Sequence, residues 1–275
     1  MSNKKNKFKA ACLQMTTGCD LDESISFLRE KLTLAKDMGA DVVVTPEQTL
    51  LMEKNSKTLF SKISYPDDDN GLKKLQSLIR ELELIVIVGS ISIKYSDNLA
   101  YNRTYAFDAN GEIIGTYDKI HMFDVELSAK ERYFESNTFK PGDKLSIIDL
   151  PWCKFGLSIC YDLRFPSLYR NLAQKGASVI IVPSAFTVKT GRAHWETLLR
   201  ARAIETGCFI IAPAQVGKHQ NGRETYGNSM IISPWGKILS HVEDDNYIGI
   251  AEINLQEVES YRKMIPSINQ NYDYN

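Results

Sequence analysis

The fold is set by residues 8–46, FKAACLQMTTGCDLDESISFLREKLTLAKDMGADVVVTP, which predict a strand, a helix and a second strand in succession. The first strand covers residues 8–15. The helix begins after Asp20, whose carboxylate is a favourable N-cap, and it ends at Gly39. The second strand, at residues 41–46, contains three consecutive valines, so we expect it to be buried on both faces.

The same alternation of strands and helices continues along the chain. The dipeptide Asn110-Gly111 between strand-like segments is the strongest hairpin signal. We expect strands at 84–93, 101–109, 112–117, 145–150, 155–160, 178–183, 209–215, 229–233 and 248–253, and helices at 72–82, 167–175 and 194–206. This mixture predicts an α/β fold with mixed sheets covered by helices. Because no linker rich in Pro, Gly or Ser divides the chain, we expect a single domain over residues 1–275.

Composition points to an ordinary soluble globular protein. The 275 residues are 43% hydrophobic and 24% charged, with a formal net charge of -1. Without a basic surplus, we expect no binding to nucleic acid or to an anionic membrane. The sequence has no run of about 18 apolar residues, so we expect no membrane span. No apolar run precedes Phe8, which argues against a secretory signal.

The five cysteines are irregularly spaced, at positions 12, 19, 153, 160 and 208. An odd number in a chain without an export signal favours thiols in a reducing compartment, so we expect a cytoplasmic location. No C-x-x-C pair occurs, and the four histidines are scattered. We therefore expect no metal site.

Cys160 stands in the segment GLSICYD at residues 156–162, where an alternating strand ends. Pro166 then opens a predicted helix, so the cysteine lies on a strand-to-helix turn. A nucleophile on such a turn is exposed to substrate, and the backbone N–H of Tyr161 can face a developing oxyanion. Most lone cysteines are instead small buried core residues. On this segment alone, both interpretations stay open.

Two charged residues are candidates to assist Cys160, because a cysteine with an ordinary pKa of about 8.5 needs activation. Glu47 follows the buried valine strand, and burial there is expected to raise its pKa and suit it to proton transfer. Lys119 ends a hairpin strand, where a cation could stabilise a thiolate and an oxyanion. The alternatives are a surface glutamate and a solvated lysine paired with Asp118.

Together, three segments resemble the signature segments of the nitrilase (carbon–nitrogen hydrolase) superfamily, in the same order. They are TPE at 45–47, YDKIHMFD at 117–124 and CYDLRFP at 160–166. The likeness covers essentially the whole chain, from Lys9 to Gly236. It implies a four-layer αββα sandwich with two mixed sheets, a Glu-Lys-Cys triad, and no metal or organic cofactor.

The resemblance also implies a role for each site residue. Glu47 would be the general base for Cys160, while Lys119 and the N–H of Tyr161 would hold the oxyanion of a reaction that passes through a thioester. The family usually has a second glutamate that orients the lysine. Its best match here is Glu135, with Glu131 as the alternative register.

The likeness is closest to the branch of deaminated-glutathione amidase and ω-amidase. It rests on SAFTVKTGRAHW at 184–195, LRARAIET at 199–206 and YGNSM at 226–230. Arg192 and QVGKH at 215–219 favour the first activity, whereas Asn228 stands where the branch has His. The expected function is hydrolysis of a small carboxylate-bearing amide, with release of an amine or ammonia. The alternatives are an ω-amidase acting on α-ketoglutaramate or α-ketosuccinamate, and a catalytically idle interaction protein.

Four residues are predicted to bind the substrate: Tyr161, Arg164, Phe186 and Thr187. Arg164 could hold a carboxylate through two parallel hydrogen bonds. Its structural alternative is an ion pair with Asp162 or Glu205. Phe186 could instead belong to the core, as aromatic residues at such spacing more often do. The resemblance further implies a homodimer or higher homo-oligomer, with the small amide as the remaining partner.

Overall fold

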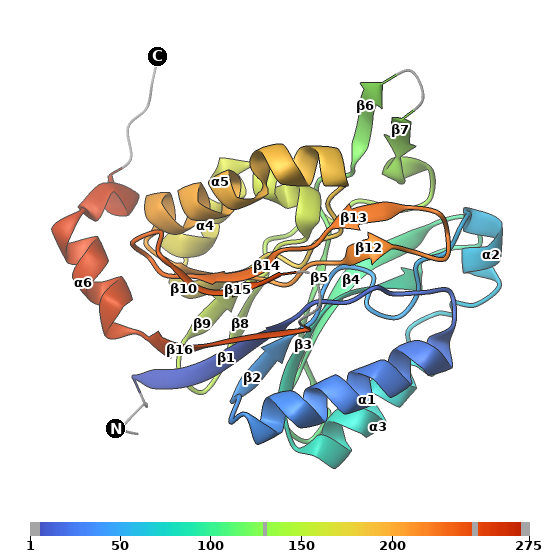
Figure 1. The fold of residues 1–275 in the computed structure, drawn as a ribbon, viewed down its shortest axis with the longest axis horizontal. Helices are drawn as coiled ribbons and strands as arrows, with labels where there is room; N and C mark the ends of the chain where they lie inside the picture. The colour runs from blue at the N-terminus through green and yellow to red at the C-terminus, as the bar shows by residue number, and fades with distance from the viewer. Residues whose placement is uncertain (1–5, 129–130, 244–246, 271–275) are drawn as a thin grey trace.

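The computed structural model describes residues 6–128, 131–243 and 247–270, and two six-stranded sheets stand at its centre (Figure 1). In the first sheet β1, β2 and β3 are parallel, and the other strands pair antiparallel. The order across this sheet is β16 (Ile248–Asn254), β1 (Lys7–Leu13), β2 (Val42–Val44), β3 (Ile85–Lys94), β4 (Ala100–Phe107) and β5 (Ile113–Asp118).

The second sheet has the same mixture, with a parallel centre formed by β9, β10 and β11. The order across it is β15 (Ile238–Val242), β14 (Ser229–Ile232), β11 (Phe209–Ala212), β10 (Ala177–Ile181), β9 (Lys154–Gly156) and β8 (Ile147–Asp149). Both sheets are therefore mixed, as predicted.

Helices cover the outer faces of the two sheets and complete four layers (Figure 1). On the first sheet lie α1 (Leu21–Asp37) and α3 (Asn70–Leu82), and on the second lie α4 (Pro166–Gln174) and α5 (Val188–Thr206). Strand β2 shows how the layers form. Val42 and Val44 belong to the core between the sheets, whereas Val43 faces the core beneath α1 and α3. Alternate side chains of a strand point to opposite faces, so this short apolar strand serves two cores. The αββα sandwich is confirmed.

The ends of α1 follow from local chemistry that the sequence makes visible. One Asp20 carboxylate oxygen accepts from the backbone N–H groups of Asp22 and Glu23, at 2.8 and 3.0 Å. These contacts satisfy donors that have no partner within the helix. At the other end Gly39 has a φ of +84°, which a glycine adopts without steric cost.

Helix α5 begins six residues earlier than predicted, at Val188 instead of residue 194. Thr187 is its N-cap, and its side chain accepts from the N–H of Thr190. The first turns lack an apolar stripe because Gly191 packs against the ring of Tyr226, where a side chain would clash. A helical pattern based on apolar spacing therefore starts too late.

Several short elements were not expected from the sequence. They are α2 (Ser56–Phe60), the hairpin β6 (Asp124–Ser128) and β7 (Glu131–Phe134), the hairpin β12 (Val216–Lys218) and β13 (Glu224–Tyr226), strand β15, α6 (Gln256–Met264), and 3₁₀ turns at Glu135–Asn137, Cys160–Arg164 and Pro266–Asn269. The strand predicted at 155–160 ends early, at Gly156. Within the described ranges, no helix is long and apolar enough to cross a membrane.

Candidate active site

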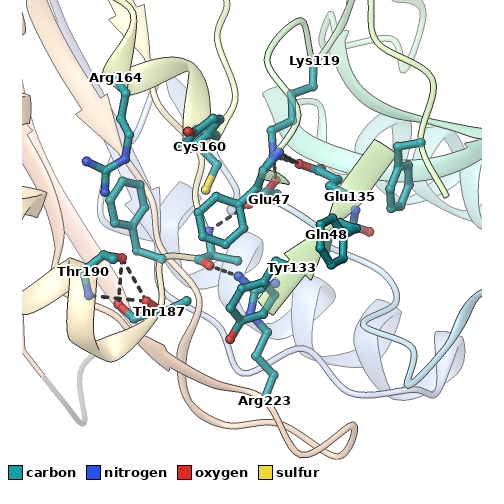
Figure 2. A pocket seen from close by; sticks show the side chains of 16 residues that line it. Glu47, Gln48, Lys119, Tyr133, Glu135, Cys160, Arg164, Thr187, Thr190 and Arg223 are labelled. Carbon is teal, nitrogen blue, oxygen red and sulfur yellow. Dashed lines mark hydrogen bonds and ion pairs between the residues drawn. The ribbon is translucent and has the colours of Figure 1, made fainter. Parts of the chain in front are cut away.

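Cys160 lies on a tight turn between β9 and α4. It opens the 3₁₀ turn Cys160–Arg164, and its φ of +49° is rare for a residue other than glycine. Its N–H donates to Pro183 O at 2.9 Å, which ties the turn to the end of β10. The residue is 7% exposed and lines a cavity, into which its sulfur points (Figure 2).

Glu47 follows β2, and its carboxylate is buried, with 4% of the residue exposed. Oε1 accepts from Lys119 Nζ and from Asn102 Nδ2, both at 2.9 Å. Oε2 accepts from the N–H of Ala185 at 3.0 Å. The Cys160 thiol lines the same cavity as this carboxylate, whose negative charge acts on it. Glu47 is thus a fixed acceptor beside the sulfur, and the surface-glutamate alternative is wrong.

Lys119 stands directly after β5 and bridges two carboxylates. Its Nζ lies 2.9 Å from Glu47 Oε1 and 2.9 and 2.8 Å from the two oxygens of Glu135. Only 2% of the lysine is exposed, so it is not solvated. Asp118, the alternative partner, instead pairs with Arg103 at 2.6 and 2.8 Å.

Glu135 is held in place by contacts beyond Lys119. It accepts from the N–H of Phe123 at 2.7 Å and from Asn102 Nδ2 at 3.1 Å. Asn102, on β4, therefore connects the two carboxylates through one amide group. The alternative register, Glu131, accepts from Tyr133 O–H at 3.3 Å and does not contact Lys119.

The charges of these groups set their protonation states. Burial and the nearby negative charge of Glu47 raise the pKa of Cys160 above its ordinary value. For Glu47, burial opposes ionisation, but the Lys119 ammonium outweighs it and holds the pKa below its ordinary value. Burial likewise opposes the charge of Lys119, yet Glu135 and Glu47 raise its pKa. At neutral pH the site therefore holds a thiol, an ionised Glu47 and an ammonium.

The direction of the Glu47 shift corrects the prediction from the sequence, which expected a raised pKa. That prediction considered only the desolvation of a carboxylate next to a buried strand. It omitted Lys119, which directly follows β5. This residue lies 72 positions further along the chain, yet its Nζ is 2.9 Å from Glu47 Oε1.

The cavity around Cys160 has a volume of about 240 Å³. All four predicted substrate-binding residues line it: Tyr161, Arg164, Phe186 and Thr187. Its wall also includes aromatic side chains from the segment between β5 and α4, namely Phe123, Tyr133, Phe134 and Phe139. It combines an apolar lining with a few fixed polar groups, as is typical of small-molecule sites.

Arg164 reaches the cavity, and no carboxylate of the described residues pairs with it. Its Nη2 lies 3.2 Å from His194 Nδ1, and its guanidinium lies 5.7 Å from the centre of the Phe186 ring. Neither predicted structural partner contacts it. Arg202 pairs with Glu205 at 2.9 Å, and the contacts of Asp162 lie elsewhere. Arg164 is thus placed to meet an anion in the cavity.

Asp162 is fully buried and joins the lysine segment to the cysteine turn. Oδ2 accepts from Tyr117 O–H at 2.8 Å and from the N–H of Ile159 at 2.9 Å. Oδ1 accepts from the N–H of His121 at 3.0 Å and lies 2.6 Å from its Nδ1. Because Tyr117 and His121 flank Lys119 in the chain, these contacts fix the ammonium relative to the sulfur.

The sequence did not identify Asn102, Tyr133 or Arg223 as site residues. Asn102 carries a weak signal, since it is a polar side chain within a predicted strand. Tyr133 and Arg223 belong to the hairpins β6–β7 and β12–β13, which were not expected. Among the described residues, no group of three or more His, Cys, Asp or Glu side chains could hold a metal ion.

Comparison with known proteins gives one consistent family. Residues 9–263 match the model of the carbon-nitrogen hydrolase family. A deaminated glutathione amidase of Synechocystis sp. is 37% identical, over 95% of this chain and 97% of that protein. The amidase of the same name from Yersinia enterocolitica is 36% identical, over 95% and 92%. The crystal structure of the C. elegans NitFhit protein superposes with a TM-score of 0.88 at 33% identity, and covers 96% of this chain and 65% of that one.

Proposed function

Because the chain belongs to the carbon–nitrogen hydrolase family and is an amide-hydrolysing enzyme, we propose that it works through a thioester on Cys160. The observation that carries this proposal is the position of Glu47 and Lys119, which are in contact with each other beside the sulfur. A base and an oxyanion donor beside a nucleophile form the arrangement required for acyl transfer. With these side chains in place, the alternative of an idle interaction protein has no support.

In the first step the sulfur attacks the amide carbon as its proton passes to Glu47. The carbonyl oxygen becomes an oxyanion, which Lys119 Nζ and the N–H of Tyr161 stabilise. The tetrahedral intermediate then collapses, the C–N bond breaks, and Glu47 donates its proton to the leaving nitrogen. Glu135 takes no part in these transfers and positions the ammonium.

In the second half of the reaction, water attacks the thioester carbon and Glu47 accepts a proton from it. The C–S bond breaks as the acid forms, and the proton returns from Glu47 to the sulfur. One carboxylate thus serves alternately as base and acid, which a fixed buried position beside Cys160 permits.

For the substrate, we propose an amide whose acyl group carries a carboxylate, with deaminated glutathione as the first candidate. The relatives that bear that name support it, and so does Arg164 at the cavity wall. The amide bond of this compound joins an α-keto dicarboxylic acyl group to cysteinylglycine. The ω-amidase substrates α-ketoglutaramate and α-ketosuccinamate share the carboxylate-bearing α-keto acyl type, and the small volume of the cavity favours them as a second candidate.

We also propose a cytoplasmic homodimer or higher homo-oligomer. Several apolar side chains are exposed on α5, α6 and the turn before β15: Ile204 (43%), Trp235 (62%), Met264 (64%) and Ile265 (42%). Trp235 contacts Tyr261 of α6, with ring centres 5.6 Å apart, so these elements adjoin. Light scattering after size-exclusion chromatography tests the association, and the variant Trp235→Lys should weaken it.

The mechanism is tested by trapping the thioester. Wild-type protein mixed rapidly with substrate should show the mass of the acyl group on Cys160 and should form a hydroxamate with hydroxylamine. The variants Glu47→Gln and Cys160→Ala should release no amine, and the latter should show no adduct. Release of amine by Cys160→Ala at a rate near that of wild type would refute the mechanism.

A further inference from the structure

A second cavity, of about 580 Å³, lies beside the reaction cavity. The two share Tyr133, Thr187 and Arg223 in their walls. The second cavity is formed by the first turn of α5, the hairpin β6–β7 and the turn of the hairpin β12–β13. The two cavities therefore adjoin at these three side chains.

Size indicates that a long substrate must use both spaces. Pockets for drug-sized ligands measure about 300–1,000 Å³, and the reaction cavity, at about 240 Å³, falls below this range. It suits an acyl group of a few carbon atoms better than a whole peptide-like amide. The two cavities together fall within the range, so the second is the available place for a large leaving group.

The charges around the second cavity favour an anion. Its wall carries three cations, Lys189, Arg192 and Arg223, against two acids, Glu131 and Glu224. Arg192 is exposed and, within the described part of the chain, makes no ion pair or hydrogen bond. Lys189 Nζ donates at 3.2 Å to the backbone carbonyl of Leu127, and no carboxylate in the described ranges forms an ion pair with it.

Arg223 stands at the junction of the two cavities. Its Nη2 donates to the carbonyl of Ala185, and its guanidinium lies 5.6 Å from the centre of the Tyr133 ring. Figure 2 shows its side chain next to that of Tyr133. Its Nε is buried and has no hydrogen-bond partner among the described residues. Buried donors are almost always paired, so this N–H is suited to a polar atom of a bound ligand.

We propose that the second cavity binds the leaving group of a long amide, with its terminal carboxylate held by Arg192 and Lys189. In this arrangement Arg164 meets the carboxylate of the acyl group, and Arg223 faces the polar backbone between the two ends. The proposal rests on the proposed function and specifies its substrate as an amide that carries a carboxylate at each end. The geometry thus provides a basis for selecting a peptide-like leaving group over ammonia.

The test compares three amides: deaminated glutathione, the same compound with its glycine carboxylate converted to a neutral methylamide, and α-ketoglutaramate. For Arg192→Gln, KM for deaminated glutathione should rise about five- to tenfold, and 0.5 M salt should reduce this difference because ions screen exposed charges. KM for the two compounds without the remote charge should change less than twofold. Arg192→Lys should recover most of the loss. Arg132→Gln is the matched control, since Arg132 lies on β7 outside both cavities and pairs only loosely with Glu126, at 3.7 Å.

Two results overturn the inference while the proposed function stands. One is an equal effect of Arg192→Gln on charged and neutral substrates. The other is an effect of Arg132→Gln as large as that of Arg192→Gln, which would reflect the general field of the surface. Failure of the wild-type protein to cleave any of the three amides would instead refute the proposed function itself.

Discussion

Gly89 of β3 allows the segments that carry Glu47 and Cys160 to approach each other, and a single methyl group there should separate them. A Cβ on this residue would lie 2.6 Å from Pro46 O, and closer still to Thr45 O and to Pro183 Cβ. Pro46 precedes Glu47, while Pro183 O accepts the N–H of Cys160. The variant Gly89→Ala therefore acts on both sides of the Glu47–Cys160 pair, although Gly89 does not line the reaction cavity.

The magnitude follows from the contact distances. Ordinary van der Waals contact begins near 3.4 Å, so the segment at Pro46 must retreat by at least about 0.8 Å. Two of the three atoms nearest to the added Cβ are backbone carbonyl oxygens, which cannot rotate away as a side chain can. A misplacement of about 1 Å can cost about a hundredfold in rate, and overpacking costs about 1–3 kcal/mol of stability. We expect kcat to fall about a hundredfold, KM to change less than threefold, and Tm to drop by a few degrees.

Gly115→Ala is the matched control. Gly115 also lies in a strand of the first sheet, on β5, and a Cβ there would contact Ile148 of the second sheet. The nearest atom is a methyl group of a side chain that can change rotamer, and neither residue lines the cavity. Gly115→Ala should lower Tm but leave kcat within twofold. If circular dichroism showed that Gly89→Ala folds and its kcat stayed within threefold of wild type, close packing at Gly89 would not position Glu47 and Cys160.

Four other perturbations test separate parts of the site. Glu135→Gln should lower kcat about a hundredfold, or about 2.7 kcal/mol, because one amide oxygen cannot accept the four hydrogen bonds that Lys119, Asn102 and Phe123 donate. A kcat near that of wild type would show that Glu135 does not position the ammonium. Arg164→Gln should raise KM for a carboxylate-bearing amide at least tenfold, because a lost hydrogen bond to a charged group costs about 1.5–3 kcal/mol. KM for an amide with a neutral acyl group should stay unchanged. Because the pKa of Cys160 is raised, alkylation by iodoacetamide should accelerate up to at least pH 9, and a plateau below pH 7 would contradict a protonated resting thiol. Tyr117→Phe should lower the free energy of unfolding in urea by about 1–3 kcal/mol, since Asp162 loses a buried donor.

The sequence predicts best those features whose causes are local. The hairpin at Asn110-Gly111 and the helix after Asp20 were correct because turn and capping chemistry act over a few residues. The start of α5 was misplaced because its first turns pack through Gly191, which has no apolar side chain. The hairpin β6–β7 was missed since its strands alternate without a buried face.

Site residues could be expected from the sequence only where they lie in segments that resemble a family pattern, because the sequence itself does not show which residues meet in space. Glu47, Lys119 and Cys160 carry no mutual signal in the sequence, and only the resemblance of three distant segments to a family pattern led us to expect them together. The structure places all three at one cavity. Asn102 has no such segment, although it connects Glu47 and Glu135. The sign of the Glu47 pKa shift was equally inaccessible, because it depends on a balance between burial and a cation whose distance only the fold determines.

The charge count of the site explains why proton transfer and attack must occur together. At rest the ionised Glu47 and Glu135 and the ammonium of Lys119 sum to a net charge of -1. A preformed thiolate would place a second net negative charge in a buried region, which is why the pKa of Cys160 is raised. In the proposed attack, Glu47 becomes neutral as the oxyanion forms, so the net charge stays at -1. The negative charge moves from one partner of Lys119 to another, while Glu135 holds the ammonium still. Because the donors are already oriented, little reorganisation accompanies this shift.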